Sequence, residues 1–435
     1  MFFQRSLIFN SLYLIYIKIV KNYFNNFLAN GILQIARFLI LFLFARFNSP
    51  SDFGILSILL LIANYNVNVN LGAINGLKRQ LPLKYIRYNS VELNEINASI
   101  FTFNLLMTII SASIIIVFIS DFVSGLSIYD KFNFLIYTIS FNVFFFFQTL
   151  TISFGDFRYL KKIHYYNSLL LIICISFTFF SRTFFFAALA LSYLLLNIKI
   201  FKQKYDYRLI IKKNHVTENM KIGLPIMIGG FVFLFFQSLD RIFVSKYFPS
   251  ILLGYYSFAW LLVSSMNLII NLSNDILLQK GARRYSEKEN RIMLFKYIHK
   301  YMFMMYAIIF FLSIILFFVS GPLINIYYPK YIGSIIILKY LLVSLLIQQL
   351  FSGIVNYLYL INKQKSYLLS ITLSLLLEVA IFFTVTNLKF NYLIYVKTFI
   401  IANLIYSFFL TYLVREEILV ILKSFFLRDV NEYNG

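Results

Sequence analysis

The chain has 435 residues, of which 60% are hydrophobic and 13% charged, with 39 Lys and Arg against 17 Asp and Glu. This composition excludes an ordinary soluble protein. The basic excess alone would suggest nucleic-acid binding, but the basic residues lie in clusters between apolar stretches of about 20 residues, the length of a helix that crosses a ~30 Å hydrocarbon core. The charge therefore indicates membrane topology, with membrane lipids and not nucleic acid as the surroundings.

Taken in chain order, residues 1–26 combine an apolar run with Arg5, Lys18 and Lys21, and we interpret them as an uncleaved cytoplasmic interfacial segment. The apolar runs that follow lack the alternation of barrel strands, so each is expected to be a helix. An all-α integral membrane protein with about 12 transmembrane helices is the predicted fold class. The predicted spans are 27–47, 53–77, 97–119, 132–152, 164–181, 183–201, 222–246, 252–278, 300–320, 333–360, 366–386 and 391–413.

The connections between these spans predict the orientation. If the N-terminus is cytoplasmic, the inner connections and tails hold 28 Lys and Arg, whereas the outer connections hold six. A bias of this size over short loops predicts that both termini are cytoplasmic. The outer loops are all short, and the longest inner connections are too small to fold alone, so the protein is expected to act within the membrane.

An internal repeat appears at an offset of 200 residues. The segment ARFNSPSDFGILS at 45–57 aligns with SKYFPSILLGYYS at 245–257, each with a basic-aromatic pair, a proline and a glycine. Duplicated units of six helices would share one orientation, which predicts two parallel six-helix bundles around a central cavity. The predicted organisation is an N-terminal bundle at 27–201, a basic cytoplasmic linker at 202–221, a C-terminal bundle at 222–413 and a cytoplasmic tail at 414–435.

Motifs for cofactor or metal chemistry are missing from the sequence. Cys174 is the only cysteine, which excludes an intrachain disulfide and a thiolate metal site. His164, His215 and His299 each stand alone in or beside basic connections and are interpreted as solvated. No phosphate-binding loop, HExxH pair or nucleophile elbow occurs. We therefore expect no cofactor, no metal and no enzymatic activity.

Two stretches carry a family resemblance: LQIARFLILFLFARFNSPSDFGILSILL near the start, and GLPIMIGGFVFLFFQSLDRIFVSKYF from residue 223. They resemble the corresponding parts of the O-antigen (Wzx-type) lipid-linked oligosaccharide flippases of polysaccharide biosynthesis, which are related to the multidrug and toxic-compound extruders. The resemblance implies a flippase of the bacterial plasma (inner) membrane. Its substrate would be a polyprenyl-diphosphate-linked oligosaccharide, the repeat unit of O-antigen in lipopolysaccharide or of a similar surface polysaccharide. It would move from the cytoplasmic to the outer leaflet by alternating access, with a polysaccharide polymerase as a further partner.

Charged residues inside the predicted spans are candidates for the site. A charge at the centre of a membrane helix costs roughly 2.5–3.5 kcal/mol, so such residues are expected to pair, face a wet cavity or meet a charged substrate. The planar guanidinium suits bidentate contacts with phosphate oxygens. The predicted diphosphate-binding residues are Arg37, Arg241, Lys339 and Lys397. The alternative for Arg37 and Arg241 is a structural pair between helices, above all for Arg241 beside Asp240. The alternative for Lys339 and Lys397, in the outer half of the membrane, is snorkelling to the interface.

Buried carboxyl groups suggest ion coupling as a further hypothesis. Asp240 and Glu378 lie deep in the seventh and eleventh predicted spans and are candidates for reversible protonation.

Asparagines form two helical stripes. Asn267, Asn271 and Asn274 follow i, i+4, i+7 spacing, and Asn64, Asn68 and Asn75 form a similar stripe. Amides exchange hydrogen bonds with sugar hydroxyls, so Asn68 and Asn271 are predicted to contact the oligosaccharide. The alternative is a role in holding packed helices together.

The same region predicts two local features. The alternation NYNVNVN fits no helical face and indicates local unwinding near 66–72. Gly72 and Gly76 are expected to allow a close helix approach.

Two other functions remain as alternatives. A multidrug exporter of the same architecture would need an acidic, apolar cavity for organic cations, which the basic residues in the spans disfavour. A membrane polysaccharide polymerase or ligase would need a large outer loop, which the sequence does not contain.

Overall fold

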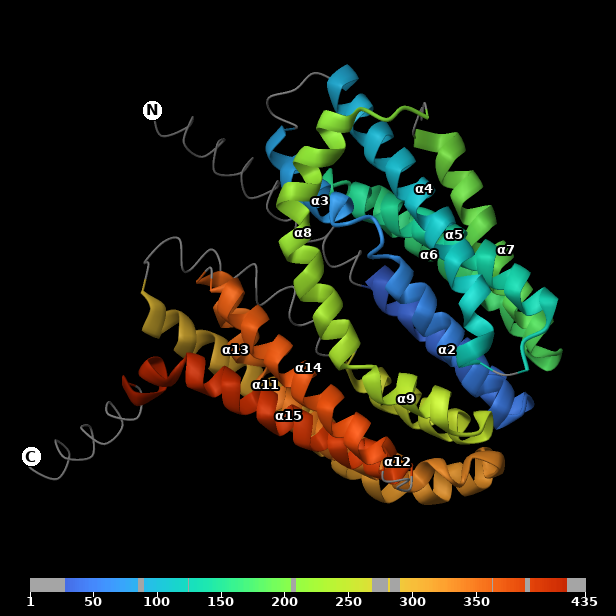
Figure 1. The fold of residues 1–435 in the computed structure, drawn as a ribbon, viewed down its shortest axis with the longest axis vertical. Helices are drawn as coiled ribbons and strands as arrows, with labels where there is room; N and C mark the ends of the chain where they lie inside the picture. Colours follow the sequence, from blue (N-terminus) through green and yellow to red (C-terminus); the bar gives the residue numbers. More distant parts are fainter. Residues whose placement is uncertain are drawn as a thin grey trace, which may run out of the picture. The chain divides into compact units, whose positions relative to one another are not determined.

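A computed structural model describes residues 28–84, 90–123, 125–204, 209–267, 281, 290–361, 363–387 and 392–420. Throughout these residues the regular secondary structure is helical, with no strand (Figure 1). Ten of the described helices are long and apolar enough to cross a membrane. The prediction of an all-α, multi-pass membrane protein is therefore confirmed.

Contacts divide the chain into two units, the first ending at Phe231 and the second beginning at Val232. The helices of unit 1 are Leu28–Phe47, α2 Pro50–Asn66, α3 Ala73–Lys84, α4 Ser90–Phe122, α5 Ile128–Ser153, α6 Phe157–Cys174, η1 Ile175–Phe179, α7 Arg182–Lys204 and the larger part of α8 Lys213–Phe236. α8 begins inside the segment predicted as a linker, because the polar run from Lys213 to Lys221 is helical.

Unit 2 contains the end of α8 and the helices that follow it. They are α9 Leu239–Tyr247, a helix over 250–267, α11 Arg291–Tyr327, η2 Pro329–Tyr331, α12 Ser334–Leu350, α13 Ser352–Leu360, α14 Gln364–Asn387, α15 Leu393–Leu413 and a short helix over 415–420. The predicted span 252–278 extends into residues outside the described part of the chain.

The turn within the sequence repeat occurs at equivalent residues in both units. In unit 1 a helix ends at Phe47 and α2 begins at Pro50, with the Ser49 side chain accepting from the Asp52 amide as an N-cap. In unit 2, α9 ends at Tyr247 and the next helix begins at residue 250. The 200-residue offset therefore holds for local structure as well as for sequence.

Three predicted spans are interrupted helices. The unwinding near 66–72 is confirmed: α2 ends at Asn66, and Leu71 and Gly72 have φ values of 51° and 82°. The spans 222–246 and 333–360, predicted as single helices, are instead broken at Gln237–Ser238 and at Phe351. At each break a serine hydroxyl bonds to a backbone carbonyl of the preceding turn. The Ser238 hydroxyl donates to the Leu234 carbonyl, and the Ser352 hydroxyl donates to the Gln349 carbonyl at 2.8 Å.

Glycines bring two helices of unit 1 into backbone contact, as expected of Gly72 and Gly76. A Cβ atom on Gly76 would overlap the carbonyl group of Asn219 in α8, and one on Gly223 would overlap the carbonyl group of Gly72. Gly72 also has a positive φ, which side chains rarely adopt. The broken second span is therefore held directly against the start of α8.

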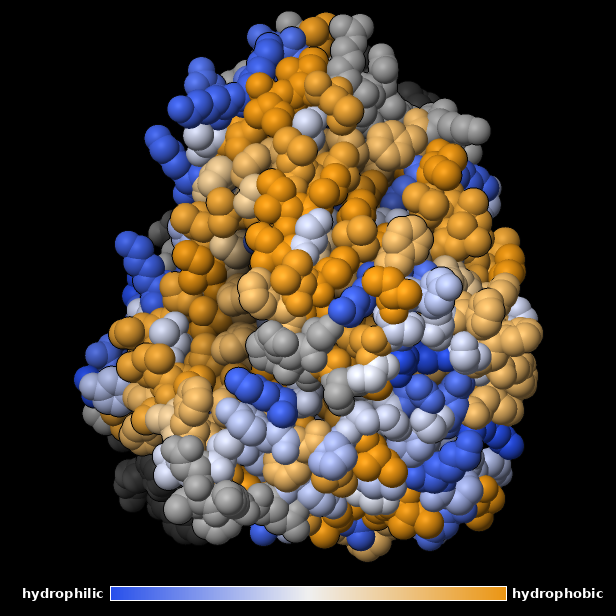
Figure 2. All heavy atoms as spheres, turned by 45° about the vertical axis from the view of Figure 1, so that its right-hand side comes forward, coloured by the Kyte–Doolittle hydropathy of each residue, from blue (hydrophilic) through white to orange (hydrophobic). Residues whose placement is uncertain are grey.

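Apolar side chains cover much of the outer surface, and Figure 2 shows wide hydrophobic areas on one face. Val117, Phe318 and Phe408 are 70%, 72% and 69% exposed, although each lies within a long apolar helix. Such exposure is costly in water and favourable in lipid. The polar residues that remain inside the two units therefore require an explanation.

Candidate functional site

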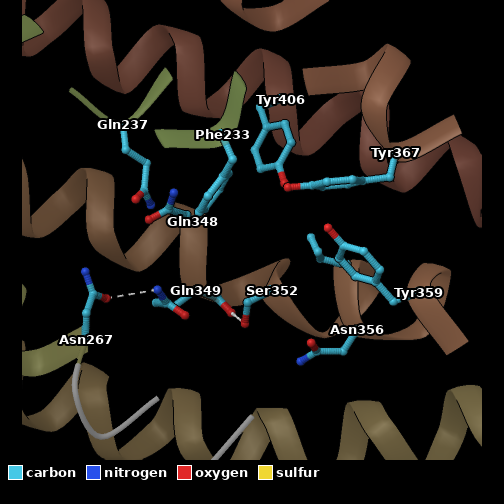
Figure 3. Close-up of a pocket in the computed structure, with 11 residues that line it drawn as sticks. Phe233, Gln237, Asn267, Gln348, Gln349, Ser352, Asn356, Tyr359, Tyr367 and Tyr406 are labelled. Atoms are coloured by element: carbon cyan, nitrogen blue, oxygen red, sulfur yellow. Dashed lines mark hydrogen bonds between the residues drawn. The ribbon is translucent and has the colours of Figure 1, made fainter. Parts of the chain in front are cut away.

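A cavity of about 310 Å³ lies inside unit 2 (Figure 3). It is lined by Phe233, Gln237, Asn267, Gln348, Gln349, Ser352, Val355, Asn356, Tyr359, Tyr367 and Tyr406. Most of these residues come from α12 and α13, and Gln237 lies at the break between α8 and α9. None of the lining side chains carries a formal charge. The cavity thus offers amides, hydroxyls and aromatic rings.

Most of these lining residues were not predicted as site residues, although the spacing of polar residues in the sequence indicates a polar helical face. Gln348, Ser352 and Asn356 follow i, i+4, i+8 spacing, which is close to the i, i+4, i+7 spacing that identified the stripe of Asn267. Asn267 does line the cavity, and its Oδ1 atom accepts a hydrogen bond from Gln349 Nε2 at 3.1 Å. Asn271, the member of that stripe chosen for sugar binding, lies outside the described residues and stays a prediction.

Asp240 is fully buried at the start of α9, one turn from Gln237. Its Oδ2 atom accepts from the Tyr256 hydroxyl at 2.8 Å and from Trp260 Nε1 at 3.0 Å, and its Oδ1 atom accepts from the Arg241 amide at 2.7 Å. Neutral donors therefore satisfy this carboxyl group, since no cation of the described chain lies within 4.0 Å of its oxygens.

Arg241 consequently is not the ion-pair partner of Asp240. Its guanidinium lies over the Trp260 ring, 4.8 Å from the ring centre, and Nη2 is 3.5 Å from the Gln237 carbonyl. Its Nε atom is buried and has no hydrogen-bond acceptor among the described residues. The ring supplies a cation–π contact, which leaves most guanidinium N–H groups available for an anion.

Glu378 on α14 is the second buried carboxyl of unit 2. The residue is fully buried, and neither carboxyl oxygen has a hydrogen-bond partner in the described part of the chain. It lies within electrostatic range of Asp240. Two carboxyl groups therefore share one apolar region, and only one of them is satisfied by the protein.

Lys339 and Lys397 lie away from the cavity. Lys339 Nζ is 4.8 Å from the centre of the Phe317 ring on α11, and Lys397 Nζ is 5.5 Å from that of Tyr340 on α12. Lys397 is exposed, and neither residue lines the cavity. Their predicted substrate role stays a prediction.

Arg37 lies in unit 1, ten residues into the first described helix. Its Nη2 atom donates to the Tyr193 hydroxyl of α7 at 3.3 Å, and its Nε atom is buried without an acceptor in the described chain. Tyr137 and His164 lie within electrostatic range of the Arg37 guanidinium. No carboxylate of the described residues lies within ion-pairing distance of Arg37.

His164 corrects the interpretation of a solvated histidine. It is 2% exposed on α6, and its Nε2 atom is 3.2 Å from Gln148 Nε2. The basic residues around it in sequence concealed this burial, because they lie on other faces of the helix.

Of the asparagines near the helix break in unit 1, two have structural roles. Asn66 donates to the Ser111 hydroxyl at 2.8 Å and accepts from Asn142 at 3.1 Å, whereas Asn70 accepts from the Ile74 amide at 3.3 Å. The Asn68 side chain is half-buried and makes no hydrogen bond to the described residues. Asn66 and Asn70 therefore make structural contacts, and the sugar contact of Asn68 stays a prediction.

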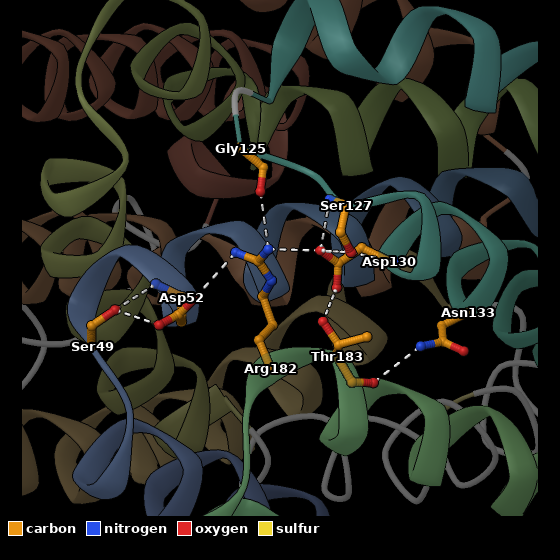
Figure 4. Close-up of polar contacts among 8 residues, drawn as sticks. All are labelled: Ser49, Asp52, Gly125, Ser127, Asp130, Asn133, Arg182 and Thr183. Carbon is orange, nitrogen blue, oxygen red and sulfur yellow. Dashed lines mark hydrogen bonds and ion pairs between the residues drawn. The ribbon is translucent and has the colours of Figure 1, made fainter.

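Arg182 differs from Arg37 in having carboxylate partners, although the Nε atom of each lacks an acceptor among the described residues (Figure 4). It contacts Asp130 at 2.7 Å, Asp52 at 3.2 Å and the Gly125 carbonyl at 3.1 Å. Asp130 is fully buried and also accepts from Ser127 and Thr183. This network joins the starts of α2, α5 and α7, so its role is structural.

The fold and the long apolar helices define an all-helical, multi-pass membrane protein. The structure is similar to that of the lipid II flippase MurJ in an inward closed conformation, with a TM-score of 0.71 and 18% identity over 92% of both chains. It is also similar to an inward-facing multidrug resistance MATE family transporter of the MOP superfamily, with a TM-score of 0.71 and 11% identity over 90% of this chain and 96% of that one. A MOP superfamily transporter from Pyrococcus furiosus matches with a TM-score of 0.58 and 13% identity over 92% of this chain and 95% of that one.

Residues 43–336 match the family model described as polysaccharide biosynthesis protein. The chain belongs to this family of polysaccharide biosynthesis proteins. No match was found among curated protein sequences. The named structural neighbours are flippases and transporters, not enzymes, and at these identities they show the shared fold.

Replacing Arg182 with Ala is expected to lower the free energy of unfolding by about 3–5 kcal/mol, because the buried Asp130 carboxylate loses its counter-charge. The measurement is thermal unfolding in detergent. Asp52→Asn removes only a contact whose acid is 38% exposed and is expected to cost about 0–1 kcal/mol. Arg46→Ala, at the exposed end of the first described helix, is the matched control. Equal melting temperatures for Arg182→Ala and Arg46→Ala would contradict the assignment.

Replacing Glu378 with Leu is expected to raise the free energy of unfolding by about 1–3 kcal/mol, because it removes a buried polar group that lacks a partner and preserves most of the volume. The same thermal measurement tests this change. Ser374→Ala, one turn earlier on α14, is the control, since the Ser374 hydroxyl is bonded to the Ser370 carbonyl. A lower melting temperature for Glu378→Leu would show that Glu378 is structurally required.

Proposed function

We propose that this protein is a flippase that moves a polyprenyl-diphosphate-linked oligosaccharide from the cytoplasmic to the outer leaflet of a bacterial plasma (inner) membrane by alternating access. The oligosaccharide would be a repeat unit of O-antigen or of a similar surface polysaccharide. Family membership and a fold shared with a lipid II flippase support this class of substrate. The basic inner loops support cytoplasmic termini. A polysaccharide polymerase is the proposed recipient of the product.

The observation that carries the proposal is the state of Arg37. A guanidinium has five N–H donors, and here one of them meets a neutral hydroxyl while the Nε–H group is buried without an acceptor. A cation in a membrane helix is costly unless an anion or water meets it. A diphosphate supplies that anion, and its oxygens match the planar fork in a bidentate contact.

Arg241 is the proposed second contact for the diphosphate. Its guanidinium is held over Trp260 and is free of any ion pair to Asp240. A cation positioned by an aromatic ring is oriented without being neutralised, so its charge remains available to a substrate anion. Lys339 and Lys397 contact the less electron-rich rings of Phe317 and Tyr340. We propose that they attract the anionic headgroup by their charge without binding it directly.

Asp240 and Glu378 are the proposed ion-coupling groups. Glu378 has no hydrogen-bond partner in the described chain, so its charge state depends on what reaches it from outside the protein. A state with a proton bound and a state without it would differ by a full charge in an apolar region, which is enough to favour different conformations.

A multidrug exporter is the second candidate, favoured by the similarity to a MATE family transporter and by the buried acids of unit 2. Organic cations would be repelled by Arg37 and Arg241, neither of which is neutralised by a described carboxylate. Saturable transport of ethidium by the purified protein, unaffected by lipid diphosphates, would favour this second function.

Changing Arg37 and Arg241 together to Ala is expected to lower translocation of an undecaprenyl-diphosphate-linked sugar by about a hundredfold or more. Each charge-assisted contact is worth roughly 1.5–3 kcal/mol, and both are lost. The measurement is the rate at which labelled lipid becomes accessible on the far leaflet of proteoliposomes.

The matched controls are Arg46→Ala and Lys246→Ala, which remove a cation from the end of the same helix in each case. Both controls are expected to transport at the wild-type rate. Full transport by a well-folded double variant of Arg37 and Arg241 would refute the proposed function.

Replacing Glu378 with Gln is expected to make translocation insensitive to the proton gradient, because the amide cannot change its charge. Initial rates are measured in proteoliposomes at several imposed gradients, with wild type and Ser374→Ala side by side. A gradient dependence identical to that of wild type would remove Glu378 from the coupling mechanism.

A further inference from the structure

The cavity of unit 2 has a chemistry different from that of a diphosphate site. The eleven lining residues within the described part of the chain include no Lys, Arg, His, Asp or Glu. An anionic or cationic ligand group placed there would be desolvated without a counter-charge, which is strongly unfavourable. A purely apolar occupant, such as a lipid tail, would leave the amides of Gln348 and Gln349 without hydrogen bonds. A neutral polar group fits both restrictions.

Two amide atoms of the lining are buried and lack partners in the described chain. They are Gln348 Nε2, a donor, and Gln349 Oε1, an acceptor. The other end of the Gln349 amide is fixed by its bond to Asn267, so the free Oε1 atom has a defined direction. A ligand that both donates and accepts would satisfy the pair, and hydroxyl groups do both.

Two helix breaks meet at this cavity. Gln237 lies at the break between α8 and α9, and Gln349 and Ser352 lie on either side of the break at Phe351. Interrupted backbone within a membrane protein is tolerated where it lines a polar cavity or is buried in protein. The breaks therefore indicate that this cavity holds a polar ligand or water and is not a packing defect.

Aromatic rings complete the lining. Figure 3 shows Tyr359, Tyr367 and Tyr406 grouped at one side of the cavity together with Asn356, and the amides of Gln237, Gln348, Gln349 and Asn267 at the other. The ring centres of Tyr359 and Tyr367 are 5.4 Å apart. Ring faces pack against the C–H face of a pyranose, whose hydroxyl edge then points to the amides. The volume of about 310 Å³ is at the low end of the ~300–1,000 Å³ range of ligand pockets, which fits one sugar ring and not a whole oligosaccharide.

We propose that this cavity in unit 2 is a subsite for a single uncharged sugar residue. The inference rests on the proposed function for the identity of the complete substrate. It separates two recognition tasks: the guanidinium of Arg37 in unit 1 recognises the anionic carrier, and the amides of Gln348 and Gln349 recognise the sugar.

The test is ligand-observed saturation-transfer NMR on the full chain in lipid nanodiscs, which detects weak binding. The probes are the methyl glycosides of glucose, galactose, rhamnose and N-acetylglucosamine, with methyl glucuronide as the charged comparison. At least one neutral glycoside is expected to bind, and the glucuronide is expected to bind at least about tenfold more weakly. Binding of no neutral glycoside, or equal binding of the glucuronide, overturns the proposal.

The first variant is Gln348→Leu with Gln349→Leu, which is expected to weaken glycoside binding by about tenfold or more. Gln34→Leu, the same change in a membrane helix of unit 1, is the matched control and is expected to leave binding unchanged. The second variant is Val355→Phe, which keeps the amides but reduces the volume, and it is also expected to abolish binding. Trp260 is the only tryptophan, so its fluorescence reports whether unit 2 remains folded. Unchanged binding in both folded variants overturns the proposal.

A parallel titration with undecaprenyl diphosphate lacking a sugar separates the two hypotheses. If this lipid fails to bind while a neutral glycoside binds in the cavity, the proposed flippase function fails and the sugar subsite stands. If the lipid binds and is lost in Arg37→Ala while no glycoside binds, the proposed function stands and the sugar subsite fails.

Discussion

The structure depends on one constraint: a polar group inside the membrane must find a partner within the protein, because lipid offers none. The chain meets this constraint repeatedly with neutral donors and acceptors. Asn403 donates to the Ser344 hydroxyl at 2.9 Å, and Asn142 joins Asn66 at 3.1 Å. Asp240 is bonded by the Tyr256 hydroxyl. Such contacts hold helices together without bringing a second charge into the interior.

Against this background, the unsatisfied groups are informative. Arg37, Arg241, Glu378 and Gln348 retain buried polar atoms without partners in the described chain. Arg182 shows what a structural arginine looks like in the same protein, with two carboxylates and a carbonyl around it. The difference between Arg182 and Arg37 is the physical argument for a functional cation. Exceptions of this kind concentrate where a substrate or ion completes the bonding.

Hydropathy predicted the spans and the fold class, because length and apolarity are what a bilayer requires of a helix. It could not predict the breaks at Gln237–Ser238 and Phe351, since both lie within long hydropathic stretches that lack proline and glycine at the break. The break at 67–72 was predictable only because its alternating asparagines contradict helical periodicity.

The faces of the helices were the least predictable feature. A membrane helix is apolar all round, so its sequence does not say which side meets lipid and which side meets protein. His164 was therefore expected in solvent yet is buried. Arg37 was identified correctly as an isolated cation, because no acid lies near it in sequence or among the described residues in space.

The uncharged lining described for the cavity of unit 2 suits the transport function proposed for this protein. A site that releases its ligand must not destabilise the protein when it is empty. The desolvation cost of a buried neutral amide is far smaller than that of a buried ion. Water can occupy the cavity between cycles and bond to Gln348 and Gln349 at little cost. A charge is needed only where the ligand itself is charged. In the proposed mechanism an anionic carrier is recognised by the cations Arg37 and Arg241, whereas a neutral sugar is recognised by amides that also bond to water.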